Sequence, residues 1–316
     1  MKNGELIAIG GIYLDFNAPD FPISEGGLQP ETEIVGNKYI AELGGSAVNF
    51  ARLCAKLEVP TTFIGKVGQD FTGQLVSQLL PDAGVQPSLI QSPEVQTNIS
   101  FNMISSNGES IMAVVGSANQ ALDADEVYAR VVEKLEHSPY LFLGGCFKLK
   151  KLLPAYAQLV DDAKNLGTKV VIDHGRLNDD VTNDEKNIVR EMAINADTYL
   201  PSTDEFIQLW EVASLEEGLQ KFRQLSVATI VVKDGAKGAV TIDANGEISR
   251  VPTFLVSPLH TIGAGDSFNA GFISAQYKGM ELEDSIRFGC ATGALKVSQT
   301  ELPTYDEVST LSNSDR

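Results

Sequence analysis

The segment from His260 to Phe272 carries the residue types from which a phosphate-binding turn is built. Within it, Gly263–Gly265 places backbone N–H groups side by side, with little side chain to block an approaching anion. Asp266 follows at once, and the pattern from Ser267 to Tyr277 predicts a helix, whose start offers unpaired N–H donors and the positive end of a dipole. A carboxylate beside an anion pocket stands where a base could take a proton from a substrate hydroxyl. This combination indicates phosphoryl transfer, in which positioning and electrostatics supply most of the catalysis.

A purely structural interpretation of the same segment is also open. An aspartate near the start of a helix is a common cap, and glycines often serve only to turn the chain. The tetrapeptide Gly263–Asp266 does not by itself separate the two interpretations. The choice therefore depends on what the rest of the chain supplies.

The elements that must position this turn follow an α/β pattern. Short apolar runs predict buried parallel strands, and apolar residues at helical spacing between them predict helices on both faces of one sheet. The predicted strands are Leu6–Gly10, Thr62–Gly65, Tyr140–Leu143, Val170–Asp173, Thr198–Leu200 and Ile230–Val232. The predicted helices are one capped by Ser46, then Asp125–Glu136, Lys151–Asn165, Glu185–Asn195, Leu215–Leu225 and the last helices from Glu283 to Ser298.

Two strand-like insertions, near residues 12–43 and 96–115, interrupt this alternation. Glu33 to Leu43 alternates weakly, as an exposed strand does, and Asn107-Gly108 is the strongest short hairpin signal in the chain. We interpret the insertions as a small β lid over the carboxyl edge of the main sheet, where open α/β sheets bind ligands. The predicted divisions are a core of residues 1–11, 44–95 and 116–308, a lid of residues 12–43 and 96–115, and a flexible tail of residues 309–316.

Composition limits the partners. The 316 residues have 43% hydrophobic and 21% charged residues, as in a globular protein with a sizeable core. No run approaches the length of a membrane span, the N-terminus does not resemble a signal peptide, and the three cysteines lie far apart, so we expect a cytoplasmic protein with reduced thiols. The net charge of −18 repels nucleic acid and anionic lipid, so neither is an expected partner.

Three motifs at proper separation carry a resemblance. They are Gly44-Gly-Ser-Ala-Val-Asn49 opening a helix, Gly65-Lys-Val-Gly-Gln-Asp-Phe-Thr-Gly73, and Thr261-Ile-Gly-Ala-Gly-Asp266, with Asp15 five residues after Gly10. From Leu6 to about Val308 the chain resembles the ribokinase-like (PfkB) family of carbohydrate and nucleoside kinases. The sequence has no P-loop and no protein-kinase catalytic loop, and Phe268 stands where a dinucleotide fingerprint needs glycine.

The resemblance implies a role for residues in both halves. Asp266 would be the base for the acceptor hydroxyl, and Gly263, Ala264 and Gly265 would hold the charge that develops on the transferred phosphoryl group. The positions that would hold the sugar are Asp15, Gly44, Gly45 and Asn49. For Asp15 and Asn49, ordinary turn and helix capping is the alternative. Gly145 would approach the substrate, whereas Gly65, Gly68 and Gly73 shape turns.

The resemblance also implies a nucleotide site. Gly235 and Gly238 would let the backbone pass close to the phosphates and adenine, and Lys233 either pairs with phosphate or is a solvated lysine at a strand end. Small residues on one helix face either make room for adenine or only pack the helix; these are Cys290, Ala291 and Ala294. Ser202 is assigned to the nucleotide site. Glu205 would organise Mg²⁺ through water, because Mg²⁺ commonly keeps several of its waters.

Two residues depart from the family pattern. Ser202 stands where the family usually has the Asn of Asn-x-x-Glu, and His260 stands where it usually has an Asp that in many members helps bind a monovalent cation. Imidazole is a poor ligand for K⁺, so we predict weak or absent activation by K⁺.

The expected activity is an ATP- and Mg²⁺-dependent kinase of a small sugar, with the lid as a route to a homodimer. The family's phosphosugar kinases tend to carry Lys after the paired glycines, and Ser46 here favours an unphosphorylated, fructose- or ribose-like acceptor. A nucleoside acceptor and a non-catalytic sugar- or nucleotide-binding member are the alternatives. A wall for a nucleobase, or equally a lid core, could come from Tyr13, Phe16, Tyr39, Phe101 and Met103.

Overall fold

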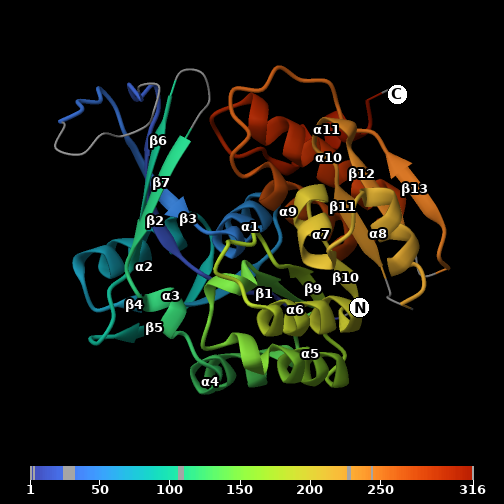
Figure 1. The fold of residues 1–316 in the computed structure, drawn as a ribbon, viewed down its shortest axis with the longest axis horizontal. Coiled ribbons are helices and arrows are strands. Elements are labelled where there is room, and N and C mark those ends of the chain that lie inside the picture. The colour runs from blue at the N-terminus through green and yellow to red at the C-terminus, as the bar shows by residue number, and fades with distance from the viewer. Residues whose placement is uncertain are drawn as a thin grey trace.

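The computed structural model describes residues 2, 4–23, 33–105, 110–225, 229–242 and 245–314. Within them, nine strands form a large sheet in the order β13-β12-β11-β10-β9-β8-β1-β4-β5, in which only β12, near one edge, runs antiparallel to the others (Figure 1). Its strands are β1 Leu6–Gly10, β4 Thr61–Gly68, β5 Gln86–Ser92, β8 Tyr140–Gly144, β9 Lys169–Asp173, β10 Thr198–Tyr199, β11 Ile230–Lys233, β12 Ala239–Ile242 and β13 Ile248–Val251.

Helices cover both faces of this sheet, as the continuous apolar runs predict. In β1, Ile7 and Ile9 pack into one core cluster and Leu6 and Ala8 into the other, so a single strand supplies both. The first cluster lies under α4 Ala124–Leu135, α5 Tyr156–Asn165, α6 Asn183–Asn195, α7 Thr203–Trp210 and α8 Leu215–Phe222. The second lies under α1 Ser46–Lys56, α2 Phe71–Asp82, α9 Ala264–Tyr277, α10 Leu282–Ser298 and α11 Tyr305–Ser312.

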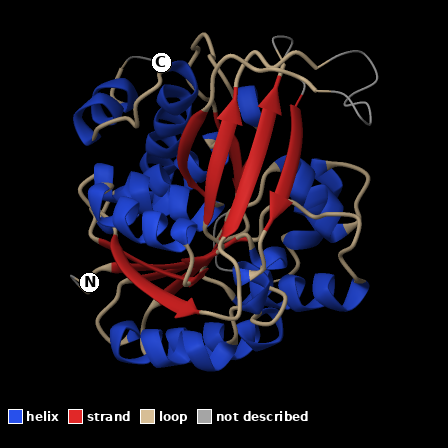
Figure 2. Ribbon diagram, turned by 90° about the vertical axis from the view of Figure 1, so that its left-hand side faces the viewer, coloured by secondary structure: helices blue, strands red, loops and turns tan. Residues whose placement is uncertain are grey.

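A separate four-stranded sheet stands away from the large one (Figures 1 and 2). Its order is β3-β2-β6-β7, with β2 and β6 parallel and the outer pairs antiparallel. Residues directly opposite one another share a face, so Asp15 lies on one face with Ser100, and Phe16 lies on the other with Phe101. The strands are β2 Tyr13–Ala18, β3 Ile40–Gly44, β6 Asn98–Ile104 and β7 Ser110–Val115, and the short helix α3 Ala118–Ala121 follows β7.

Several predicted boundaries are wrong, each for a local reason. The strand predicted over Glu33–Leu43 begins only at Ile40, because its partner β2 ends at Ala18, before Pro19, which has no N–H to donate. The helix predicted over Lys151–Asn165 is divided, with Leu153–Ala155 forming a 3₁₀ turn around Pro154 before α5. The hairpin turn Asn107-Gly108 lies outside the described residues.

Three helix ends also differ from prediction. Gly45, with φ of 104°, is the N-cap of α1, and Ser46 is its first helical residue rather than its cap. Asp123 caps α4, which begins at Ala124. The flexible tail predicted from residue 309 is wrong for residues 309–312, which belong to α11. Arg287 holds the end of that helix by donating hydrogen bonds to the carbonyl oxygens of Ser312 and Ser314, at 2.6 and 2.8 Å.

The helices α2, α3, α7 and α11 and the strand β5 were not predicted. Among the helices in the described part of the chain, none is both long and apolar enough to cross a membrane.

Candidate active site

The Gly-Ala-Gly-Asp turn forms the first turn of α9. The helix begins at Ala264, three residues before the predicted start, with Gly263 as a left-handed N-cap at φ of 76°. The first N–H groups of a helix have no partner within it, and the side chain of Gly263 offers none. The backbone donors of Gly265 and Asp266 therefore lie at the positive end of α9, as an anion site requires.

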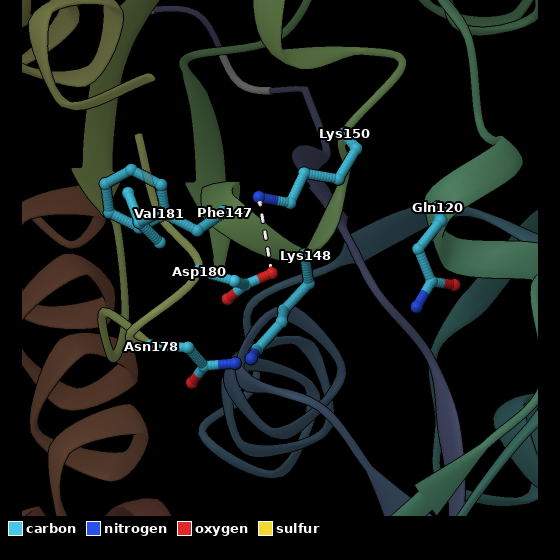
Figure 3. Close-up of a pocket in the computed structure, with 7 residues that line it drawn as sticks. All are labelled: Gln120, Phe147, Lys148, Lys150, Asn178, Asp180 and Val181. Carbon is cyan, nitrogen blue, oxygen red and sulfur yellow. Dashed lines mark ion pairs between the residues drawn. The ribbon is translucent and has the colours of Figure 1, made fainter. Parts of the chain in front are cut away.

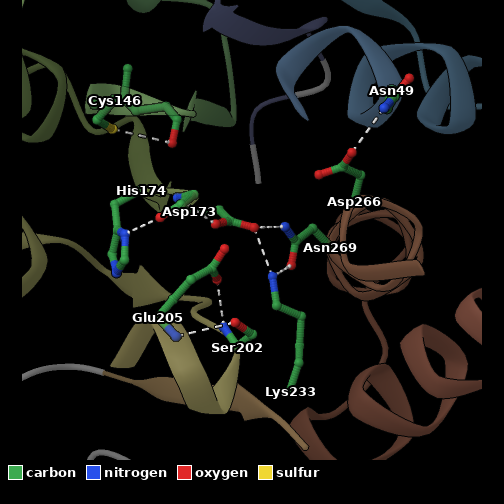
Figure 4. Close-up of polar contacts among 11 residues, drawn as sticks. Asn49, Cys146, Asp173, His174, Ser202, Glu205, Lys233, Asp266 and Asn269 are labelled. Carbon is green, nitrogen blue, oxygen red and sulfur yellow. Dashed lines mark hydrogen bonds and ion pairs between the residues drawn. The ribbon is translucent and has the colours of Figure 1, made fainter. Parts of the chain in front are cut away.

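Asp266 and Asn49 meet across two helices (Figure 4). Asn49 Nδ2 on α1 donates to Asp266 Oδ2 at 2.9 Å, a contact that the sequence did not predict. Burial raises the pKa of Asp266 to about 7, with repulsion from Asp173 and Glu205 adding to the effect, while Asn49 and Lys233 oppose it. A carboxyl group with a pKa near 7 suits a general base at neutral pH.

Asp15 lies against the turn from β3 into α1. A Cβ atom on Gly44 would stand 1.9 Å from Asp15 Oδ2, and one on Gly45 would stand 2.3 Å from the carbonyl oxygen of Gly11. Gly45 is therefore required by contact with backbone and by its positive φ, whereas Gly44 is required only while the Asp15 side chain keeps its position. Burial raises the pKa of Asp15 to about 6, and the charge of Glu42 on β3 adds to the effect. The structure thus brings together the four predicted sugar residues, and Asn49 connects them to Asp266. We call Asp15, Gly44, Gly45, Asn49 and Asp266 the Asp15 row.

Lys233 belongs to a buried network that the sequence did not predict. Its Nζ lies 2.7 Å from Asp173 Oδ2 and donates to Asn269 Oδ1 at 3.1 Å, and Asn269 donates to the same carboxylate oxygen of Asp173 (Figure 4). Lys233 is only 9% exposed, so the solvated strand-end interpretation is wrong. A Cβ atom on Gly265 would stand 3.5 Å from Lys233 Nζ, which places this ammonium group directly beneath the first turn of α9.

The opposite charges of Lys233 and Asp173 each favour the ionised form of the other. Burial alone would lower the pKa of Lys233, but the negative charges of Asp173 and Glu205 raise it above its usual value. Burial likewise opposes ionisation of Asp173, and Lys233 nevertheless lowers the pKa of that carboxyl group. The two residues form a buried ion pair between the ends of β9 and β11, which flank the short strand β10, next to Asn269 on α9. Lys233 would therefore interact with a bound phosphate from beneath the first turn of α9.

The predicted nucleotide glycines lie between β11 and β12, in the turn that contains Gly235–Lys237. Gly235 and Gly238 both have positive φ, of 54° and 96°. A Cβ atom on Gly238 would stand 2.1 Å from the carbonyl oxygen of Val251, so packing alone explains this glycine. Nothing lies within 4 Å of the corresponding position on Gly235, which borders open space.

Ser202 and Glu205 form a capping box at the start of α7. Ser202 Oγ accepts from the backbone N–H of Glu205 at 3.4 Å, and Glu205 Oε2 accepts from the backbone N–H of Ser202 at 2.8 Å. Serine caps helices about as well as asparagine does, so Ser202 caps α7 although the family usually has Asn at this position. The second carboxylate oxygen of Glu205 takes no part in the box. A single available carboxylate oxygen fits Mg²⁺, which is commonly bound by one or two carboxylates together with water and substrate phosphates.

The cysteines and their small neighbours are core residues. Cys290 and Ala291 belong to the second core cluster, which supports the packing interpretation over an adenine pocket. Cys54 and Cys146 are also buried and unpaired, and burial raises the pKa of the thiols of Cys54 and Cys290 to about 12.

His260 lies partly exposed before α9. Burial lowers the pKa of its imidazole, and the positive charge of Lys296 lowers it further. The weak response to K⁺ stays a prediction.

The aromatic residues of the small sheet lie mostly away from Asp15. Phe16 stacks on Phe101 with ring centroids 5.5 Å apart and contacts Tyr39 at 5.9 Å, on the face opposite Asp15. The Asp15 face is polar on the central strands β2 and β6, and its outer strands carry the exposed apolar residues Ile40, Met112 and Val114. It carries hydrogen bonds from Asn102 to Asn17, from Asn17 to Glu42 and from Ser100 to Asn102. The polar side chains next to Asp15 suit hydroxyl groups.

Comparison with known proteins agrees with this geometry. The family model described as pfkB family carbohydrate kinase matches residues 5–305. A 5-dehydro-2-deoxygluconokinase of Shouchella clausii is 26% identical, over 98% of this chain and 96% of its own. A ribokinase of Haemophilus influenzae is 24% identical, over 88% of this chain and 90% of its own.

Solved structures share the fold at lower identity. The structure of Arabidopsis thaliana ribokinase complexed with ribose and ATP has a TM-score of 0.80 at 23% identity, over 99% of both chains. A putative ribokinase II from E. coli in complex with ATP and Mg²⁺ has a TM-score of 0.81 at 20% identity, over 98% of both chains. The chain has the ribokinase-like fold and belongs to the PfkB family of carbohydrate kinases, phosphotransferases that act on a sugar hydroxyl.

Proposed function

We propose that this protein transfers the γ-phosphate of ATP to a hydroxyl group of a small, unphosphorylated sugar, with Asp266 as the general base. The observation that carries the proposal is the placement of the Asp266 carboxylate. It lies in the first turn of α9, beside unpaired backbone donors, and accepts a hydrogen bond from Asn49. Its pKa of about 7 leaves it able to take a proton at neutral pH.

Each residue of the row has a chemical task. Asp15 accepts hydrogen bonds from acceptor hydroxyls and so orients the sugar. Asp266 takes the proton of the attacking hydroxyl, a step typically worth about 10²–10⁴-fold in rate. The backbone N–H groups of Gly263, Ala264 and Gly265 hold the charge on the transferred group, although that of Ala264 first has to leave its 3.4 Å hydrogen bond to the Thr261 carbonyl oxygen. Losing one such donor typically costs about 10²–10³-fold. Lys233 adds a positive charge beneath this turn.

The nucleotide and the metal would lie on the β11 side of the turn. ATP supplies the phosphoryl group, and Mg²⁺, which Glu205 would hold through water, offsets the charge of the phosphates. Gly235 leaves open space for the nucleotide at this edge. The strands β2 and β3 carry Asp15 and Gly44, so closure of the small sheet as a lid would cover the reacting groups and exclude water, the competing acceptor.

Relatives named ribokinase and 5-dehydro-2-deoxygluconokinase support a sugar as the acceptor. The polar side chains next to Asp15 support the same choice, and the aromatic rings of Phe16 and Phe101 lie on the other face of the small sheet.

The test is ADP release by the purified protein with Mg-ATP against a panel of sugars, polyols, sugar acids and nucleosides. We expect one or more sugar-type acceptors to raise turnover far above background. Asp266→Asn should abolish this rise while the acceptor still raises the thermal unfolding temperature. Asp161→Asn, an exposed change on α5, serves as the matched control and should keep full turnover.

Two outcomes would contradict the proposal. Turnover with nucleosides alone would assign the protein to the nucleoside kinases of the family. No turnover with any acceptor, together with ligand-induced stabilisation, would indicate a non-catalytic binding protein.

A further inference from the structure

A pocket of about 310 Å³ lies at the carboxyl ends of β8 and β9 (Figure 3). The segments that follow these two strands supply most of its wall, and α3 supplies the remainder. The lining residues are Gln120, Phe147, Lys148, Lys150, Asn178, Asp180 and Val181.

Neighbouring contacts place this pocket beside the row of sugar residues. Gly144 at the end of β8 pairs with Gly10 of β1, and a Cβ atom on Gly144 would stand 3.1 Å from the backbone nitrogen of Ala47, in the first turn of α1. On the other side, the Asn119 side chain bonds both the N–H and the carbonyl oxygen of Ile12, just before β2. The loop that leads to Lys148 and the helix that carries Gln120 therefore both border the Asp15 row.

Gly145 lies in the chain between Gly144, which is close to α1, and Phe147, the next residue that lines the pocket. It has a positive φ of 65°, and nothing lies within 4 Å of the position that a Cβ atom would take. The 3₁₀ turn Cys146–Lys148 follows directly. The space over Gly145 is therefore open at the start of the segment that leads to Lys148.

The two lysines of the pocket differ in their partners. Lys150 Nζ lies 2.7 Å from Glu185 Oε1 and 3.8 Å from Asp180 Oδ2, so its charge is balanced (Figure 3 shows the pair with Asp180). The partly buried Lys148 has no hydrogen bond or ion pair with any residue in the described part of the chain. Burial lowers the pKa of Lys148, and the neighbouring charges of Lys150 and Arg176 oppose a further positive charge, while Asp180 favours it.

The charges around Lys148 indicate that the pocket binds an anion with a single negative charge. A partly buried ammonium group without a partner gains most from a charged acceptor. The amide of Asn178 adds a neutral donor on the side of Lys148, and the amide of Gln120 lies on the α3 side of the pocket (Figure 3). A dianion such as phosphate would leave one charge facing Asp180, whereas a carboxylate matches one lysine.

We propose that this pocket is a subsite for a carboxylate group of the acceptor, recognised by Lys148, so that the acceptor is a sugar acid. The proposal rests on the proposed function, whose acceptor site it extends. Within a chain of net charge −18, such a local positive site selects for charge and also offsets the general repulsion of an anionic substrate.

The test compares each acid with its neutral amide, for example gluconate with gluconamide, so that only the charge differs. The panel is five- and six-carbon aldonic acids, their 2-dehydro derivatives and the corresponding amides, and the measured quantity is kcat/KM for ADP release. We expect the best acid to exceed its amide by about 10- to 100-fold, as expected for a hydrogen bond between charged groups.

Three variants assign this difference to the pocket. Lys148→Met should lower kcat/KM for the acid by about 10- to 100-fold and leave the amide unchanged. Lys148→Arg should restore most of the preference for the acid. Lys151→Met removes an exposed neighbouring lysine that does not line the pocket, and should change neither value.

A binding measurement separates failure of this proposal from failure of the proposed function. Calorimetric binding of the acids that is lost in Lys148→Met, without turnover of any acceptor, would support the subsite and overturn the kinase assignment. Turnover in which acid and amide are equal, and in which Lys148→Met changes neither, would overturn the subsite and leave the kinase standing.

Discussion

Asp266 lies among groups that act on its pKa in opposite directions. Burial and the negative charges of Asp173 and Glu205 raise the pKa, and the Asn49 hydrogen bond and the Lys233 charge lower it. Their balance leaves the pKa at about 7. The base is therefore strong enough to accept a proton and still largely ionised at slightly alkaline pH.

The first prediction concerns the pH dependence of kcat. The base acts only when deprotonated, so kcat at saturating acceptor should fall as the pH decreases through about 7. Saturation removes the separate effect of Asp15, whose pKa is about 6, on binding. In Asn49→Ala the ionised form of Asp266 loses a donor, so the midpoint should move to higher pH. Asn165→Ala, exposed at the end of α5, should leave it in place. A midpoint below pH 5, or one that Asn49→Ala leaves unchanged, would argue against Asp266 as the base.

The second prediction concerns the buried ion pair. Lys233→Met leaves Asp173 buried without its counter-charge, which should lower the free energy of unfolding by about 3–5 kcal/mol in urea denaturation. Lys237→Met removes a lysine side chain that is 81% exposed, and should change stability little. Equal stability of the two variants would show that the network contributes nothing to the fold beneath the turn.

At the scale of elements, the turn from β3 into α1 fixes the acceptor site. Gly44 faces the Asp15 side chain, whereas Gly45 faces the backbone of Gly11. The Asp15 side chain can change its rotamer to make room for an added methyl group, but the backbone carbonyl of Gly11 cannot. The two adjacent glycines should therefore respond differently to the same substitution.

The third prediction uses this pair. Gly44→Ala should keep the wild-type unfolding temperature but raise the KM for the acceptor by about 10- to 100-fold, because Asp15 is displaced from its hydroxyl partners. Gly45→Ala should lower the unfolding temperature markedly, because alanine tolerates neither φ of 104° nor a contact at 2.3 Å. An unaltered KM in Gly44→Ala would refute the assignment of Asp15 to the acceptor.

The elements differ in how far the sequence predicts them. Core strands such as β1 and β8 lie between two helix layers, and their unbroken apolar runs reveal them directly. The strands of the small sheet depend on a partner, so the end of β2 at Pro19 decided where β3 begins. The strand β5 has an exposed side and only one buried core residue, Ile90, which left little apolar signal.

The residues of the active site also differ in how far the sequence predicts them. Asp266 and the glycines are adjacent in sequence and form a motif. Asp173, Lys233 and Asn269 come from β9, β11 and α9, and only the folded sheet brings them together. A charged residue at the end of each of two buried strands was the available signal, and it did not reveal that the two would pair.

At the scale of the whole molecule, the small sheet exposes apolar side chains on both faces, because Met112 and Val114 on the Asp15 face are 64% and 48% exposed. Asn98 and Ser100 are buried on the Asp15 face, while Phe101 is 41% and Val115 52% exposed on the other. Both outer strands, β3 and β7, also have an unpaired edge within the described sheet. An exposed apolar face with open edges favours association with a second copy.

The fourth prediction concerns this face. We expect the protein to sediment as a dimer at micromolar concentration, and Phe101→Arg to convert it to a monomer. Phe71→Arg alters an aromatic residue on α2 that is 79% exposed and lies outside the small sheet, so the dimer should persist. A wild-type monomer, or a Phe101→Arg variant that sediments as the wild type does, would exclude the lid as the dimer interface.

The most direct test of the whole account is single-turnover transfer of ³²P from [γ-³²P]ATP to the best acceptor. Wild-type protein and Asp266→Asn would be compared at saturating nucleotide and acceptor, with the acceptor dissociation constant measured beside each rate. We predict transfer slower by about 10²–10⁴-fold in Asp266→Asn, with acceptor affinity essentially unchanged. Transfer at the wild-type rate in that variant would contradict the assignment of Asp266 as the base.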